Sequence, residues 1–338
     1  MAGAQGDKFK VSVIVPVYNT SKYLPECLDS LVRQSIGLDS IQVVVVDDGS
    51  TDGSGEIVGT YAERYPDNFV CLSQANAGQG AARNFALMYC EGEYVGFMDS
   101  DDYADESMYE AMYAAAKEAR ADICLCGIVS FIDEGGKRSF SSRVQLPDVP
   151  CTQESLFLVP QTQPPIRLVR RELLDDNDIR FPKTRGSEDN GFHLKLAPFC
   201  KRVVTVSRPL VKRRMRAGST AVSISPCFCE QIFAVVDDAL DYYETRELCD
   251  DYGELMEAAV VRMLLCSRLG CVGNVADGRE RESLTRRTVE FVDDRFPGRA
   301  KNRYLTGILG VYLGHVDLVT ARLMRIFFAA RYRSILRF

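Results

Sequence analysis

The sequence lacks the long apolar runs and the ligand spacings that define several large protein classes. No stretch of 18 apolar residues occurs, so no membrane-spanning helix is expected. The polar segment Met1–Lys10 contains no apolar core of a signal peptide. The chain has only 2 histidines, and its 12 cysteines are scattered without the C-x₂-C spacing of zinc ribbons. We therefore expect reduced thiols, as in a cytosolic protein, rather than zinc ligands or disulfides.

Two glycine-rich nucleotide signatures are also absent or misplaced. No Walker A loop occurs. The pair Gly78 and Gly80 could belong to a dinucleotide fingerprint, but that fingerprint follows the first strand of its fold. Here the first apolar strand leads instead into Pro16 and Tyr18. A nicotinamide-dependent enzyme is therefore not expected, and the net charge of −6 argues against a general nucleic-acid binder.

Length and composition set the remaining limits. The 338 residues are enough for two domains, or for one large domain with an extension. A content of 46% hydrophobic and 26% charged residues is that of an ordinary globular protein. The charge is uneven, because residues 299–338 hold eight Lys and Arg against one acid, a net +7 that leaves −13 for the rest.

The most informative stretch is Glu93–Asp102, where a short apolar run ends in three carboxylates within four positions. Nearly continuous apolar residues predict a buried strand. Asp99, Asp101 and Asp102 then follow its carboxyl end, where open α/β sheets bind ligands. Like charges held together favour a bound cation, and oxygen ligands suit Mg²⁺ or Mn²⁺ with phosphate oxygens. The alternative is a solvated acidic turn that caps a helix starting near Asp105.

Strand and helix patterns alternate through the first half of the chain. The predicted strands are 11–15, 41–46, 69–73 and 93–98. Helices are predicted over 22–34 and 105–120, after a cap at Ser50, Thr51 or Asp52, and from the loop 76–84 to about residue 90. Pro16 lacks an N–H, so the first strand is expected to end there, and Ser21 is expected to cap the following helix. A hairpin of 123–131 with 137–144 follows. The alternation predicts an α/β fold with a mostly parallel central sheet flanked by helices.

Four motifs carry a family resemblance when they are taken together. They are Val13–Asn19, Val46–Gly53, Asn76–Asn84 and Met98–Asp102. Each alone is weakly specific, but all four occur in order, and with their spacing they resemble the inverting family 2 glycosyltransferases of the GT-A fold. The resemblance covers residues 9–105 and continues more loosely to about 225. It implies a Rossmann-like sheet and a nucleotide-sugar donor, usually UDP-linked.

The resemblance also implies roles for residues around the donor. Pro16 and Tyr18 would form the wall beside the base and the ribose. Asp48 would accept a hydrogen bond from the ring N–H of the base. Arg83 would lie near the base and the diphosphate, and its alternative is a salt bridge on the surface of a helix.

In the acidic loop, defined here as residues 99–102, the resemblance implies a metal site. Asp101 would bind Mg²⁺ or Mn²⁺ directly. Asp99 would contact the ribose or a metal-bound water. Asp102 would cap the loop or orient its neighbours.

A second group of acids lies further along the chain. Glu188–Phe192 resembles the E-D-x-x-F segment of the family, which implies Asp189 as general base and Glu188 as a residue that holds the acceptor or the sugar. An inverting transfer is a single displacement that needs one base and charge neutralisation on the leaving diphosphate. The alternative is an acidic first turn of a helix that begins at Ser187. His193 is expected to be a packed side chain rather than a ligand.

The stretch Val211–Ser219 resembles the closing Y-R-x-x-x-G-S segment of the family. Arg214 and Ser219 match it and would clamp the diphosphate, because the arginine fork suits phosphate oxygens. Arg213 stands where the family often has tyrosine, so the resemblance does not define the contact that this position makes with the donor. The alternative is a basic loop without ordered contacts.

From Pro226 onward the resemblance fades and helical spacing dominates. The predicted helices are 227–247, 252–269, 280–295 and 302–333. Over 322–338 five arginines mix with apolar residues, which predicts an amphipathic helix on an anionic membrane surface. The alternatives are an ordinary packed terminal helix and an oligomer contact.

The sequence therefore predicts a transferase domain at 1–225 and a helical appendage at 226–338, in a cytoplasmic protein placed peripherally on the inner face of the membrane. The expected activity is metal-dependent, inverting transfer of a sugar to a glycan or lipid-linked acceptor in polysaccharide synthesis, with no nucleic-acid partner. A sugar nucleotidyltransferase would need a basic glycine-rich loop where Pro16–Asn19 stands. A non-catalytic glycan-binding or scaffold protein would not need Asp189.

Overall fold

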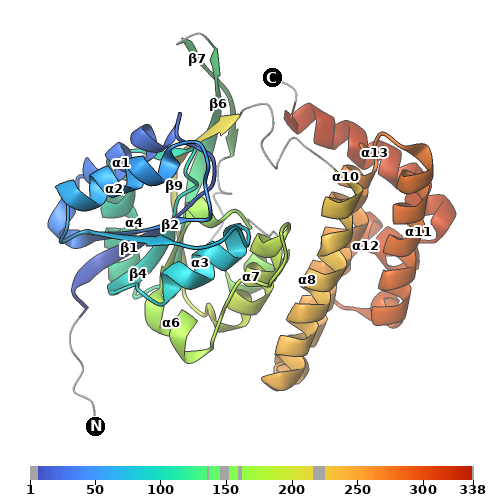
Figure 1. Ribbon diagram of the computed structural model, residues 1–338. Helices are drawn as coiled ribbons and strands as arrows, with labels where there is room; N and C mark the ends of the chain where they lie inside the picture. Colours follow the sequence, from blue (N-terminus) through green and yellow to red (C-terminus); the bar gives the residue numbers. More distant parts are fainter. Residues whose placement is uncertain (1–6, 135–136, 145–151, 159–161, 216–224, 337–338) are drawn as a thin grey trace. The chain divides into compact units, whose positions relative to one another are not determined.

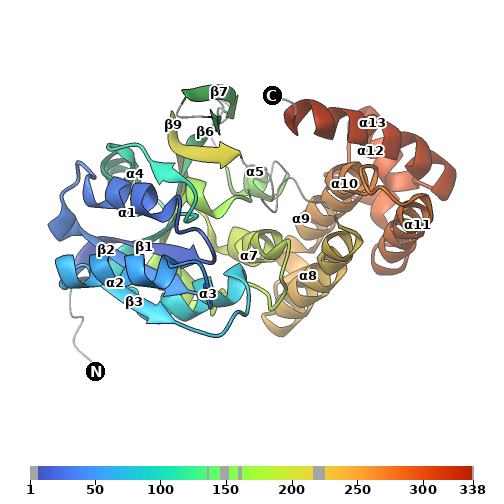
Figure 2. The ribbon, with the colours of Figure 1, turned by 45° about the horizontal axis from the view of Figure 1, so that its top comes forward.

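The computed structural model describes residues 7–134, 137–144, 152–158, 162–215 and 225–336. The chain divides into two compact units. The first unit comprises residues 1–153, 162–185 and 199–215, and the second comprises 154–161, 186–198 and 216–338. The first unit carries the sheet, and the described part of the second is helical (Figures 1 and 2).

The sheet has the strand order β3-β2-β1-β4-β8-β6-β9-β5, with β7 paired to β6 (Figure 1). Its strands are β1 (Phe9–Val17), β2 (Ile41–Asp47), β3 (Phe69–Ser73), β4 (Gly92–Phe97), β5 (Tyr103–Ala104), β6 (Ile123–Glu134), β7 (Lys137–Val144), β8 (Arg167–Arg170) and β9 (Val203–Met215). β1 to β4 are parallel, whereas β8 runs antiparallel to both β4 and β6. The parallel strands β1 to β4 and the β6–β7 hairpin confirm the sequence prediction, whereas β5, β8 and β9 were not predicted.

Helices pack on this sheet because its strands are apolar on both faces. They are α1 (Leu24–Val32), α2 (Ser54–Arg64), α3 (Gln79–Leu87), α4 (Met108–Glu118) and α6 (Arg171–Asp176). Val11, Val13 and Val15 of β1 are fully buried in one core cluster with residues of α1, α2 and α4. Strands that are buried on both faces are nearly continuous in apolar residues, so we expect the candidate site at the strand ends.

β1 continues one residue past Pro16, contrary to the prediction that it ends there. The backbone N–H of Met98 donates to Ile14 at 2.9 Å, and the pairing of β1 with β4 stops at Ile14. The N–H of Asp48 donates to Val17 on the opposite side, at 2.8 Å. Successive residues of a strand bond to alternate neighbours, so Pro16 faces the side of β4, where the ladder has already ended. The proline therefore removes no ladder hydrogen bond.

The helices of the second unit confirm the predicted helical extension. They are α5 (Gln153–Leu158, whose first residue belongs to the first unit), α7 (Glu188–Leu196), α8 (Pro226–Thr245), α9 (Cys249–Arg262), α10 (Leu269–Val272), α11 (Gly278–Arg295), α12 (Gly307–His315) and α13 (Leu318–Leu336). A π-helical turn, Met263–Arg268, joins α9 to α10. None of the helices in the described ranges is both long and apolar enough to span a membrane.

The single helix predicted over 302–333 is wrong, because the chain breaks between α12 and α13. Val316 has extended backbone angles, φ −61° and ψ 130°. The Asp317 carboxylate accepts a hydrogen bond from the backbone N–H of Thr320 at 2.7 Å, which caps α13 and lowers the pKa of Asp317. The helical spacing of apolar residues continues across the break, so the pattern alone did not reveal it.

Candidate active site

The loops after β1 and β2 are tied together by side-chain hydrogen bonds. Asn19, at φ 51°, accepts from the backbone N–H of Thr51 at 2.8 Å. The N–H of Ser21 donates to Asp52 at 2.9 Å. The prediction that Ser21 caps α1 is therefore wrong, because the helix begins after Tyr23 with no side-chain cap. These bonds fix the chain that carries Pro16 and Tyr18.

Pro16 and Tyr18, predicted to line the base and ribose, differ in exposure. Pro16 is buried in the sheet, and Tyr18 is 48% exposed just beyond the end of β1. An exposed aromatic ring at the carboxyl end of a central parallel strand is available to a ligand there.

The Asp48 carboxylate organises the loop between β3 and α3. It is 3% exposed and accepts from the backbone N–H groups of Ala77 and Gly78, each at 2.8 Å, and from the Gln74 side chain at 2.7 Å. Gly78 has φ 95°, a value that side chains disfavour. Arg185 donates to the carbonyl of Asn76 at 3.1 Å and lies against Gly78. Asp48 therefore shapes this loop, and its contact with a base remains a prediction.

Arg83 lies in the interior of the unit and not on a helix surface. Its side chain is 2% exposed, and one nitrogen lies 2.8 Å from a carboxylate oxygen of Asp99. The guanidinium also lies over the ring of Phe181, 5.3 Å from its centroid. The alternative of an exposed salt bridge is therefore excluded. The Arg83–Asp99 pair joins α3 to the acidic loop at the end of β4.

The other two carboxylates of the acidic loop have different environments. Asp101 is partly exposed, whereas Asp102 is 4% exposed and accepts from the backbone N–H of Arg214 at 2.7 Å. Burial, followed by the negative charges of Asp101 and Asp99, raises the pKa of Asp102 well above its usual range. Asp102 thus joins the loop to β9, in agreement with its predicted orienting role.

Arg214 is engaged by protein groups on every side. It is 5% exposed, donates to the backbone oxygen of Asp101 at 3.1 Å, and pairs with Glu26 at 2.5 Å and Asp133 at 2.8 Å. Its guanidinium lies 4.7 Å from the centroid of the Phe131 ring. In this arrangement Arg214 supports the acidic loop, and its contact with a diphosphate remains a prediction. Ser219, the other predicted clamp residue, lies outside the described residues.

Sequence reasoning missed this ion-pair network. Glu26 comes from α1 and Asp133 from β6, which lie 188 and 81 positions from Arg214. Arg138 of β7 also pairs with Glu26, at 2.8 Å. Such long separations leave no local pattern in the sequence, and the only signal was the basic run around Arg213. That residue donates to the Ser130 hydroxyl at 2.9 Å.

In the second unit, Glu188 and Asp189 form the first turn of α7. Both are partly exposed. One oxygen of Asp189 accepts from the backbone N–H of Asn190 at 2.9 Å and from its side chain at 3.1 Å. His193 is 3% exposed and bonded to the carbonyl of Leu156 at 2.7 Å, which confirms the prediction that it is packed.

The turn before α7 is held by a residue that sequence reasoning placed in an inert appendage. Ser187 has φ 61° and does not cap its own helix. Its hydroxyl accepts from Arg268 at 2.6 Å, in the π-helical turn. Arg268 is 6% exposed, lies over the Phe228 ring, and has two nitrogens without a hydrogen-bond partner in the described part of the chain. Arg268 and Ser187 lie 81 positions apart, so no local sequence pattern links them, and only the fold brings them together.

Comparison with known proteins identifies the family. Residues 12–177 match the family model described as glycosyl transferase family 2. Glycosyltransferase GlyG of Streptococcus pneumoniae is 31% identical over 229 residues, which cover 62% of this chain and 72% of GlyG. The chain belongs to glycosyl transferase family 2. The family resemblance of the four motifs is thereby confirmed.

Two further similar proteins bear on the fold and on the extent of the chain. The poly(ribitol-phosphate) beta-glucosyltransferase of Bacillus spizizenii is 35% identical over 185 residues, 54% of this chain, and the chain spans 28% of its length. The crystal structure of S. aureus TarS in complex with UDP matches with a TM-score of 0.68 at 24% identity, over 97% of this chain and 91% of that one. The second likeness confirms the predicted GT-A fold with its helical extension.

The Asp48 network predicts that Asp48→Asn disrupts the loop at 74–78. The new amide nitrogen would face backbone N–H donors, and a buried donor left unpaired costs about 1–3 kcal/mol. We expect urea unfolding to show this decrease in the free energy of unfolding, and donor affinity to be about 10-fold weaker because the loop is displaced.

The control is Asp52→Asn. Although partial burial opposes the shift, hydrogen bonds from Ser54 and Ser21 lower the pKa of Asp52 to about 2. Its stabilising effect is thus present above pH 3.8 and lost as the pH falls through about 2. Equal losses of unfolding free energy and of donor affinity in the two variants at pH 7 would contradict the proposal that Asp48 holds the loop at 74–78.

The Arg268 contact predicts that Arg268→Met slows catalysis without weakening the fold. Removing a buried charge that lacks an ionic partner is often neutral or stabilising. Loss of the hydrogen bond to Ser187 frees the turn that carries Glu188 and Asp189, and we expect kcat to fall about 10-fold with unchanged donor affinity. Arg268→Lys, which keeps a donor, should recover part of the rate. A decrease in melting temperature with an unchanged kcat would show that the residue is only structural.

Proposed function

We propose that this family 2 chain is an inverting glycosyltransferase that moves a sugar from a UDP-linked donor to a hydroxyl of a glycan or lipid-linked acceptor. The observation that carries the proposal is the convergence of Tyr18, the Arg83–Asp99 pair and Asp101 at the carboxyl ends of adjacent strands β1 and β4. The TarS structure with a similar fold contains UDP. The B. spizizenii relative is named for glucosyl transfer to poly(ribitol-phosphate), which supports a role in cell-surface polymer synthesis.

The acidic loop fits a divalent cation such as Mg²⁺ or Mn²⁺. Three carboxylates lie within four residues, and burial, followed by the negative charges of Asp101 and Asp99, raises the pKa of Asp102. Arg83 engages one oxygen of Asp99. In the described ranges no three His, Cys, Asp or Glu side chains form a complete metal site, so phosphate oxygens of the donor would complete the ligand shell. When bound, the cation neutralises charge on the leaving diphosphate.

The reaction is a single displacement at the anomeric carbon. The Asp189 carboxylate accepts the proton of the acceptor hydroxyl as that oxygen attacks. The bond to the diphosphate oxygen breaks, and the nucleotide diphosphate leaves with the electron pair. Glu188 orients the acceptor beside Asp189, the general base. Asp101 would hold the metal, and Asp99, held by Arg83, would contact the ribose or a metal-bound water.

Product analysis tests the proposal against both alternatives. The chain is incubated with UDP-sugars, Mn²⁺ and short poly(ribitol-phosphate), and the released nucleotide is measured. We expect UDP together with a glycosylated polymer of inverted anomeric configuration. Release of pyrophosphate would indicate a nucleotidyltransferase, and polymer binding without any release would indicate a scaffold.

The proposed domain division keeps residues 1–225 as the transferase domain and 226–338 as the helical appendage. The appendage also contributes Arg268 to the turn before α7. The proposal therefore includes a supporting role of the appendage in catalysis.

We further propose a cytoplasmic protein whose appendage docks on the inner face of the membrane. Val319, Leu323, Ile326 and Phe327 of α13 are 56–65% exposed, an unusual apolar stripe. Arg322 and Arg325 form ion pairs with Glu282 of α11, so their charges are partly neutralised within the protein. Insertion of apolar side chains, more than attraction of these two arginines to anionic lipid, supports docking.

Vesicle flotation with Val319→Gln/Leu323→Gln/Ile326→Gln tests the docking. Truncation after Ala321 is unsuitable because α13 packs on α10 and buries Ala329. We expect the triple variant to lose most vesicle binding while its melting temperature is retained. Met88→Gln, an exposed apolar change in the first unit, is the control. Equal flotation of the triple variant and the unsubstituted chain would refute docking through α13.

A further inference from the structure

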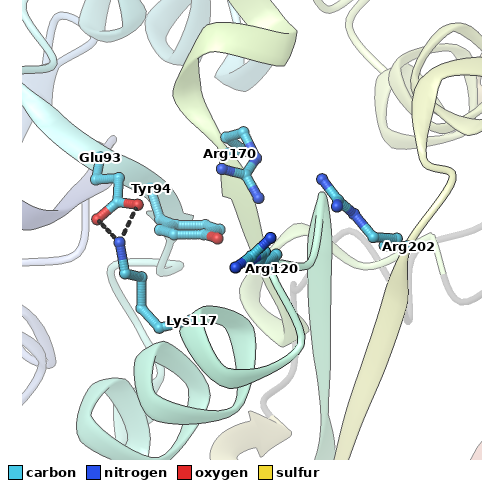
Figure 3. A pocket seen from close by; sticks show the side chains of 6 residues that line it. All are labelled: Glu93, Tyr94, Lys117, Arg120, Arg170 and Arg202. Atoms are coloured by element: carbon cyan, nitrogen blue, oxygen red, sulfur yellow. Dashed lines mark hydrogen bonds and ion pairs between the residues drawn. The ribbon is translucent and has the colours of Figure 1, made fainter.

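A basic hollow lies in the first unit at the end of the sheet opposite to the acidic loop. Figure 3 shows the six residues that line it. Its volume is about 250 Å³, and it is lined by Glu93, Tyr94, Lys117, Arg120, Arg170 and Arg202. Glu93 and Tyr94 begin β4, whereas Asp99 follows the end of that strand. At about 3.3 Å per residue, β4 separates the two places by roughly 20 Å. The hollow therefore does not belong to the donor site.

The charges around this hollow are not balanced by the protein. Lys117 is neutralised by Glu93 at 2.8 Å. Arg170 and Arg202 share a single carboxylate, Asp122, at 3.7 and 3.8 Å. That carboxylate also accepts backbone N–H groups of Lys201 and Arg202. Arg120 has no ion-pair partner among the residues that the structure describes. Three guanidinium groups thus face one shared carboxylate.

Arg170 is held in place by the protein, and Arg120 has an unusual backbone conformation. Arg170 donates to the carbonyl of Ala121 at 2.8 Å and lies over the Tyr94 ring, 5.4 Å from its centroid. Arg120 has φ 48°, a left-handed conformation that L side chains disfavour. Figure 3 shows the side chains of Arg120, Arg170 and Arg202 arranged around the space beside the Tyr94 hydroxyl. Their arrangement leaves several N–H donors directed at one small volume.

We infer that this hollow binds a phosphate group of an anionic polymer acceptor, an inference that rests on the proposed function. A planar guanidinium group can donate two parallel hydrogen bonds to a phosphate. Several guanidinium groups that face one space repel one another, and a bound anion would neutralise their charge. The volume lies just below the range of sites for drug-sized ligands, which suits a single charged group. A polymer with one phosphate per repeat can present its reacting hydroxyl at the donor site and place a more distant phosphate here.

The test compares Arg120→Gln/Arg202→Gln with the control Arg33→Gln/Arg64→Gln, which removes the same charge from exposed positions at the C-terminal ends of α1 and α2. The probes are synthetic poly(glycerol-phosphate) of about ten units, a single glycerol phosphate, inorganic tripolyphosphate, and vesicles containing phosphatidylglycerol. Affinities are measured by titration calorimetry. Stabilisation by UDP-sugar and Mn²⁺ is measured separately, so that failure of the donor site is distinguished from failure of this one.

The pocket variant is expected to bind the polymer and tripolyphosphate about 10-fold more weakly, or worse, than the unsubstituted chain, since each charged hydrogen bond is strong. The control variant should change little, and donor stabilisation should be the same in all three. Arg120→Gly, which suits the positive φ, should weaken polymer binding without lowering the melting temperature. Equal polymer affinity in the pocket variant and the control would overturn the inference. Loss of vesicle binding alone would overturn it too, and would assign the arginines to lipid headgroups.

Discussion

Asp189→Asn is expected to lower kcat about 10²–10⁴-fold, the usual contribution of a positioned general base, and to leave donor affinity nearly unchanged. The substitution is isosteric, and the remaining oxygen can still accept the hydrogen bonds that Asn190 donates to Asp189. The turn before α7 should therefore keep its conformation while losing the group that accepts the proton. The measurement pairs steady-state transfer rates with donor titration on the same preparation.

Glu188→Gln is the matched control for this prediction. It changes a neighbouring acid in the same turn of α7, and its proposed role is to hold the acceptor, so KM for the acceptor should rise more than kcat falls. If Asp189→Asn weakened donor binding as much as it slowed transfer, Asp189 would be part of the donor site and not the base. A kcat within 2-fold of the unsubstituted chain would remove it from the mechanism.

Asp101→Ala is expected to weaken donor binding about 10²-fold in Mn²⁺ and to have little effect in its absence, since the lost interaction passes through the metal. Asp101 is partly exposed, so its carboxylate is accessible to a ligand, whereas Asp102 of the same acidic loop is buried. Its removal also relieves repulsion on Asp102, so the protein without ligand should be no less stable. Donor titration across a Mn²⁺ series provides the measurement.

Asp176→Ala, an exposed acid on α6, controls for the loss of one negative charge in the first unit. It should leave the metal dependence intact. Equal weakening of donor binding by Asp101→Ala with and without Mn²⁺ would contradict a metal ligand and point to direct contact with the nucleotide. Loss of donor binding in the control would show that the net charge of the unit, and not one ligand, is being measured.

Local patterns predicted the features of the fold that lie close together in sequence. The strands that end at Asp47 and Phe97 were visible as apolar runs, and their polar exits identified the candidate site before any packing was known. The β6–β7 hairpin was equally local. The break at Val316 was missed because helical spacing continued across it and only the backbone angles changed.

Contacts that join distant segments could not be predicted in this way. Arg214 was assigned to a phosphate, yet its environment is set by Glu26, 188 positions away. Asp48 was assigned to a base, yet its oxygens hold the loop that contains Ala77 and Gly78. In both cases the residue type indicated strong polar interactions, and only the fold supplied the partners. Arg268 was overlooked because a buried arginine in a helical region carries no motif.

The most direct test of the account is the thermal stability of the chain with a panel of sugar nucleotides, each with and without Mn²⁺. A ligand that binds only the native state raises stability by mass action, about 2.7 kcal/mol at a hundred times its Kd. The account predicts an increase in melting temperature that is confined to UDP-sugars, requires Mn²⁺ and is abolished by Asp101→Ala. No increase with any nucleotide, in a chain that unfolds cooperatively, would contradict the donor site and favour the scaffold alternative.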